Sequence, residues 1–212
     1  MQCPLCGSRK ARRSCPAKSA RICGVCCATK REIEIDCPPS CSYLREGYQY
    51  AMEKNPLEQR ARSMTLGRTF DRGFLLENER FLMEVSSVIR EGYKSVPQLH
   101  DSDIVGAFAA LEKTYRTLDK GLYYDTTPEG GLGQFLYSKL KESIDLKMQN
   151  PDAHGRRLKV STVIDCLVFL QQFVQLKGSG RPLSRGYLSH LEEVFEHAPK
   201  DAPSEEPRIL LA

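Results

Sequence analysis

Apolar residues recur at helical spacing through most of the chain beyond residue 70. In the segment 70–92 they form a single stripe, made of Phe74, Phe81, Leu82, Val85, Val88 and Ile89. Side chains three and four positions apart lie on the same face of an α-helix, so this stripe predicts an amphipathic helix. Comparable stripes predict further helices over 103–120, 127–149, 158–177 and from Ser184 onward.

The segment 158–177 is the most apolar of these and is followed by Gly178, a residue typical of helix ends. We expect it to be the central helix of the core, with Cys166 buried there as a small apolar residue. Short connections favour antiparallel neighbours, so 70–198 is predicted to be an all-α bundle of four to five helices.

Polar residues before two of these segments are typical of helix N-caps. A side-chain oxygen at the N-cap accepts a hydrogen bond from a backbone N–H that has no partner within the helix. Asp101 or Ser102 is expected to cap the second helix in this way, and Ser184 the last.

The remaining sequence predicts three further parts. Residues 1–53 form a cysteine-rich module that ends in a helix, and 54–69 read as a linker. The segment 199–212 is rich in proline and acidic residues and is expected to be a flexible tail. It ends in Arg208-Ile209-Leu210-Leu211, an apolar end that could dock on the bundle or on a partner.

The cysteines are concentrated at the N-terminus. Of nine in the chain, eight lie in the first 41 residues: Cys3, Cys6, Cys15, Cys23, Cys26, Cys27, Cys37 and Cys41. Disulfides are one interpretation, but a secreted chain needs a signal peptide, and a cysteine pair occupies that place. Iron–sulfur spacings do not match this run. We therefore expect zinc bound by thiolates in a reducing, cytoplasmic setting.

The spacing of these cysteines predicts local structure. Two residues separate Cys3 from Cys6, which lets both sulfurs reach one tetrahedral ion, and Cys23 and Cys26 repeat that spacing. The segment 30–36 alternates weakly and predicts a short strand or hairpin arm, with Ile33 and Ile35 on one face. Cys37 is expected to open a helix that places it and Cys41 on one face.

A knuckle, a hairpin and then ligands at a helix start resemble a treble-clef finger, and the interleaved order resembles the cross-braced HIT-type and MYND-type zinc fingers. The resemblance covers about 45 residues and implies two structural zinc ions. The preferred partition places Cys3, Cys6, Cys23 and Cys26 on one ion and Cys15, Cys27, Cys37 and Cys41 on the other. One zinc with four spare thiols is the alternative. An all-cysteine shell leaves no open position for water, so the site is interpreted as structural.

Charge is distributed unevenly along the chain. Residues 1–31 contain eight Lys and Arg and no acidic residue, although the whole chain has a net charge of only +4. A basic loop between metal ligands suggests phosphate contact, and its residues are Arg9, Lys10, Arg12 and Arg13. The preferred interpretation is nevertheless a solvated loop or neutralisation of the thiolate charge.

Two smaller basic clusters lie near predicted helix starts, where anions are favoured. They are Arg156 with Arg157, and Arg181 with Arg185. An intervening helix of about 20 residues would separate them by roughly 30 Å, so they are interpreted as two weak anion patches or solvated loops rather than one pocket.

Together these patterns predict a non-catalytic zinc-binding interaction protein. The module and the bundle would present surfaces to a protein partner, and the bundle could also supply a dimer interface. The runner-up is an RNA- or DNA-associated factor that uses the Arg9–Arg13 loop. A third hypothesis is an enzyme with a site in the helical part, although no nucleotide-binding or nucleophile motif occurs. No apolar run is long enough to span a membrane.

Overall fold

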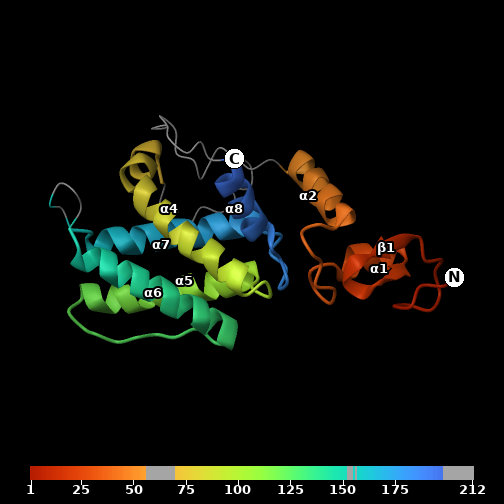
Figure 1. Cartoon of the computed structure of the whole chain (residues 1–212), viewed down its shortest axis with the longest axis horizontal. Coiled ribbons are helices and arrows are strands. Elements are labelled where there is room, and N and C mark those ends of the chain that lie inside the picture. The colour runs from red at the N-terminus through yellow and green to blue at the C-terminus, as the bar shows by residue number, and fades with distance from the viewer. Residues whose placement is uncertain (56–69, 152–154, 156, 198–212) are drawn as a thin grey trace.

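A computed structural model describes residues 1–55, 70–151, 155 and 157–197. Figure 1 shows a small N-terminal module at one end of the molecule and a bundle of helices at the other. Most of the predicted linker and the whole predicted tail, including Arg208–Leu211, lie outside the described residues. The chain is mostly helical, as its apolar spacing predicts.

The module begins with a short antiparallel hairpin of β1 (Arg13–Cys15) and β2 (Ala20–Ile22). Arg13 pairs with Ile22 and Cys15 with Ala20. A 3-10 turn, η1 (Pro16–Lys18), connects the strands. Proline suits the first position of such a turn because its fixed φ is already helical and its missing N–H would have no partner there.

Two helices complete the module. Helix α1 (Gly24–Lys30) follows the hairpin directly, and helix α2 (Ser42–Lys54) follows the last two cysteines. The prediction that Cys37 opens a helix is wrong, because α2 begins at Ser42 with Cys41 at its N-cap. A residue before proline is disfavoured in the α conformation, and Pro38-Pro39 follow Cys37.

The predicted strand over 30–36 is also wrong. The carbonyl of Lys30 accepts hydrogen bonds from the N–H groups of residues 33, 34 and 35, which closes a tight turn. Ile35 is buried at 1% exposure, whereas Ile33 is 48% exposed, so they do not share a face. The weak alternation is overridden by Glu32, whose carbonyl accepts a hydrogen bond from Leu183 N–H of the helical part.

The helical part contains α4 (Arg72–Ser95), α5 (Asp101–Asp119), α6 (Gly131–Gln149), α7 (Val160–Lys177) and α8 (Gly186–His197). Helix α7 packs along α5 and also contacts α4 and α8. Its buried residues include Leu167 and Leu170, and Cys166 is fully buried among them, as predicted. Within the described residues no helix combines the length and apolar character that crossing a bilayer needs.

The N-cap of helix α5 differs from the expected one. Helix α5 begins at Asp101 with His100 at its N-cap, so neither Asp101 nor Ser102 occupies the predicted capping position. The buried carboxylate of Asp101 instead accepts hydrogen bonds from the N–H groups of Tyr187 and Leu188, at 3.2 and 3.3 Å. Asp101 therefore caps α8 across the bundle. Ser184 assists at that end, since its hydroxyl accepts from Gly186 N–H at 3.3 Å.

Candidate metal centre

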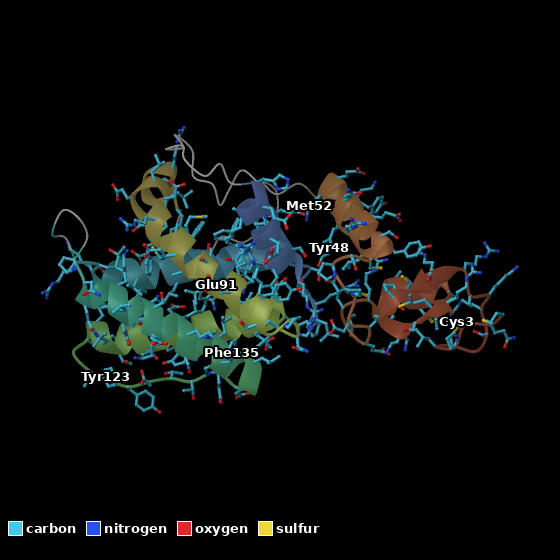
Figure 2. All side chains as sticks on the ribbon, viewed as in Figure 1. Cys3, Tyr48, Met52, Glu91, Tyr123 and Phe135 are labelled. Carbon is cyan, nitrogen blue, oxygen red and sulfur yellow. The ribbon has the colours of Figure 1, made fainter. Side chains whose placement is uncertain are left out.

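Four cysteine sulfurs converge in the N-terminal module. The Sγ atoms of Cys3, Cys6, Cys23 and Cys26 all lie within 4.8 Å of one another. Two of them, on Cys6 and Cys23, are 3.9 Å apart. Zinc bound by four sulfurs at 2.3 Å sets neighbouring sulfurs about 3.8 Å apart, so the cluster has the size of a tetrahedral site. Figure 2 labels Cys3 within the module, at the far side from the bundle.

The first pair is positioned by a tight turn. Gly7 N–H donates to the carbonyl of Cys3 at 2.8 Å, and Cys3 N–H donates to the carbonyl of Arg9. Gly7 has a φ of 64°, a conformation that glycine adopts without steric penalty. The turn folds the chain back so that Cys3 and Cys6 point to the same centre.

The second pair is positioned at the start of α1. Cys23 is the N-cap of this helix, and its Sγ accepts a hydrogen bond from Cys26 N–H at 3.3 Å. The hairpin brings these two cysteines over the first turn of the chain. The cluster thus gathers cysteines from a turn, a helix cap and the first turn of a helix.

The electrostatics of the cluster suit a bound cation. The hydroxyl and N–H of Ser8, with the N–H of Arg9, lower the pKa of Cys6 to about 5. Burial and the neighbouring sulfurs raise the pKa of Cys26 to about 12. Four thiolates at this separation repel one another, so full ionisation requires a compensating positive charge, which a divalent metal ion supplies.

The other four cysteines are buried in the same small core. Cys15, Cys27, Cys37 and Cys41 are each 6–8% exposed. Among the described residues their sulfurs do not form a second group as tight as the first. The pKa of Cys37 is raised, first by burial and also by the negative fields of Cys41 and Cys15. The structure therefore gathers the first predicted ligand set closely and buries the four cysteines of the second in the same core.

The predicted basic loop lies on the surface of the module. Arg9, Lys10 and Arg12 are exposed, whereas the Arg13 guanidinium lies over the ring of Tyr43, 4.8 Å from its centroid. Lys18 and Arg21 are also exposed, and sequence reasoning did not include them in a site.

Two of the arginines predicted as anion sites contact the module instead. Both terminal nitrogens of Arg185 donate to the carboxylate of Asp36. Nη1 of Arg181 donates to the carbonyls of Ala28 and Arg31, at 3.4 and 2.8 Å. Arg185 thus has an anionic partner within the chain. Of the other predicted pair, Arg157 is exposed and Arg156 lies outside the described residues.

A polar network accompanies these contacts. The Tyr48 hydroxyl donates to the buried carboxylate of Glu32 at 2.5 Å and lies 3.4 Å from the Ser184 hydroxyl. Ser184 in turn donates to Asp101 at 2.6 Å. Together with the contacts of Arg181 and Arg185, this network forms a joint between module and bundle. Sequence reasoning missed this joint. The available signal was the grouping of Glu32, Glu34 and Asp36, the first acidic residues along the chain, within five positions.

An open hollow of about 380 Å³ lies between α4 and α6 in the helical part. Its lining includes Glu84, Glu91 and Lys147, and Lys147 is paired with Glu84 at 2.8 Å. Figure 2 labels Glu91 on α4. The lysine charge is thus already balanced by a carboxylate, as in a surface ion pair.

Comparison of the chain with family models, with curated proteins and with solved structures finds no match.

Proposed function

We propose that this protein is a non-catalytic interaction protein whose N-terminal module is built around structural zinc. The observation that carries the proposal is the cluster of four cysteine sulfurs within 4.8 Å. All four positions of a tetrahedral ion are taken by protein ligands, so no position remains for water or substrate. Metal binding then contributes folding free energy to a module of about 50 residues, which is too small for a large apolar core.

We further propose a second zinc on Cys15, Cys27, Cys37 and Cys41. Their burial in one core and the mutual influence of Cys37, Cys41 and Cys15 support this set. The Arg31 guanidinium lies 3.8 Å from the Cys27 sulfur, which favours a thiolate there. With the first ion, the order of turn, hairpin and helix resembles a treble-clef finger.

The partner is proposed to be a protein, and one exposed loop supports this choice. Leu122, Tyr123 and Tyr124 are 65%, 71% and 68% exposed, although they are large and partly apolar. The Tyr123 ring carries the ammonium of Lys141 5.5 Å from its centroid, so the loop is held in place. Tyrosine is enriched among the residues that dominate protein interfaces. Figure 2 labels Tyr123 at the outer side of the bundle.

Native mass spectrometry of freshly isolated protein tests the zinc. We expect two ions in the intact protein, one in Cys23→Ser and one in Cys41→Ser. Cys166→Ser is the matched control, because this cysteine is buried in the bundle, and it should retain both ions. A protein isolated without any metal would contradict the proposal. If Cys41→Ser keeps as many zinc ions as the intact protein, the proposed second site is wrong.

Affinity capture from a nuclease-treated lysate tests the partner. We expect a specific protein to be retained by the full chain and lost with Tyr123→Ser combined with Tyr124→Ser. Leu146→Ser removes a similarly exposed apolar residue from α6, 59% exposed, and should leave capture intact. Equal capture by all three proteins would argue against this loop, and no capture at all would argue against a protein partner.

A further inference from the structure

We propose that the outer surface of the zinc module binds the phosphate backbone of a nucleic acid duplex. This surface, named the basic face, consists of Arg9, Lys10, Arg12, Lys18 and Arg21. The inference rests on the proposed zinc-built fold of the module, and it assigns to that module a second partner besides the protein proposed for the bundle.

The fold gathers these residues on neighbouring segments. Lys10 forms an isolated antiparallel bridge with Gln2. Arg12 N–H donates to the carbonyl of Ile22 at 3.0 Å, and the Arg21 guanidinium donates to the carbonyl of Arg12 at 3.1 Å. In Figure 2, nitrogen-tipped side chains project from the end of the module that faces away from the bundle.

The positive charge of the basic face is not compensated within the described part of the chain. None of its five residues has a carboxylate partner there, whereas Lys30 pairs with Glu34 at 2.6 Å. Glu32 and Asp36 are engaged at the joint, where Glu32 accepts from Tyr48 and Asp36 accepts from Arg185. The carboxylates of Glu32, Glu34 and Asp36 therefore pair with residues outside the basic face.

Balancing the thiolates does not account for these cations. The basic side chain that contacts a cysteine sulfur among the described residues is Arg31, at 3.8 Å from Cys27. The cysteines are largely buried, while all five residues of the basic face are exposed to solvent. The positive charge therefore points away from the metal ligands and toward solvent.

The composition of the basic face favours a nucleic acid over an acidic protein. Residues 1–42 contain no Phe, Trp or Tyr, so the face lacks the aromatic anchors common at protein interfaces. The same absence removes platforms on which single-stranded bases stack. Exposed Arg and Lys without such anchors suit contact with phosphates, which fixes position without reading sequence. Duplexes present the highest density of phosphate charge.

Fluorescence anisotropy with a labelled 20-base-pair DNA of arbitrary sequence tests the proposal on the full zinc-loaded chain. The test variant combines Arg9→Gln, Arg12→Gln and Lys18→Gln, whose side chains make no hydrogen bond or ion pair in the described structure. We expect affinity at 100 mM salt to fall about tenfold or more. The slope of log affinity against log salt should lose roughly 2 to 3 units.

The matched control removes three exposed lysines from the bundle, as Lys94→Gln, Lys113→Gln and Lys120→Gln. This control loses as much positive charge as the test variant and should bind the duplex as tightly as the wild type does. Equal losses in both triple variants, or no loss in the test variant, would overturn the proposal. Tighter binding of labelled polyglutamate than of duplex would assign the face to an acidic protein instead. Zinc measured in each sample separates failure of the face from failure of the metal-built fold.

Discussion

Arg185, the residue before helix α8, holds the carboxylate of Asp36, the residue before Cys37, with both terminal nitrogens of its guanidinium. Its Nε donates at the same time to the carbonyl of Leu99 at 3.0 Å. Arg185 is 6% exposed, so its charge is removed from water and depends on these partners. One side chain thus connects the chain next to a proposed metal ligand with two segments of the bundle.

Replacing Arg185 should therefore weaken the joint. We expect Arg185→Gln to lower the free energy of unfolding by about 2–3 kcal/mol. The loss should be smaller than for a fully buried ion pair because the Asp36 side chain is half exposed. Urea unfolding followed by circular dichroism measures the loss. Hydrogen exchange at Leu183 N–H, which donates to Glu32 across the joint, should accelerate in the variant.

The control for this variant is an exposed pair in the same module. Glu34→Gln breaks the ion pair with Lys30, where the glutamate side chain is 60% exposed, and should cost less than about 0.5 kcal/mol. In a double-mutant cycle, Asp36→Asn and Arg185→Gln should show coupling of about 1–2 kcal/mol. A loss in Arg185→Gln no larger than that in Glu34→Gln would contradict the structural role assigned to the joint.

Metal removal should unfold the module and spare the bundle. The bundle has its own core, centred on α7, and none of its described residues belongs to the proposed ligand sets. After chelation, exchange should accelerate at Arg12 N–H, which donates to Ile22 next to the hairpin. Amides within α7 should remain protected, and most helical circular dichroism should persist. Simultaneous loss of protection in both parts would show instead that they fold as one unit.

The sequence predicted best the features that depend on neighbouring residues. The C-x2-C pairs were recognised because two sulfurs at that spacing reach one ion, and the structure places Cys3, Cys6, Cys23 and Cys26 together. The helices were recognised from apolar stripes, and α7 emerges as the buried helix with Cys166 inside it. Both signals come from residues that are close to one another in the sequence.

The errors arise where distant contacts override local preference. Asp101 or Ser102 was expected to cap the helix that follows, but Asp101 caps α8, 86 residues further along the chain. Arg185 was expected in a weak anion patch or a solvated loop, although Asp36, 149 residues away, is its partner. Pairing at such separations has no signature in spacing or periodicity. The prolines after Cys37 did contain a local signal against a helix there.

The buried thiol of Cys166 predicts a simple pattern of reactivity with pH. Burial raises the pKa of Cys166 to about 12, so the group stays protonated throughout the neutral range, and its thiolate appears only as pH approaches that value. In chelated native protein, alkylation at pH 8 should modify the eight N-terminal cysteines and leave Cys166 intact. Denaturation in urea should add the ninth. Rapid modification of Cys166 in the folded protein would contradict its burial.

A pair of glycines gives opposite predictions for the same substitution. A Cβ on Gly186, the first residue of α8, would lie 2.6 Å from the carbonyl oxygen of Lys177, where backbone cannot move aside cheaply. Gly186→Ala should therefore lower the free energy of unfolding by about 1–3 kcal/mol. Gly131 begins α6 with open space around it, and Gly131→Ala should raise stability by a few tenths up to about 1 kcal/mol, because alanine loses less conformational entropy. Urea unfolding of both variants compares them directly. A stabilised Gly186→Ala would show that the end of α7 and the start of α8 are less closely packed than the structure places them.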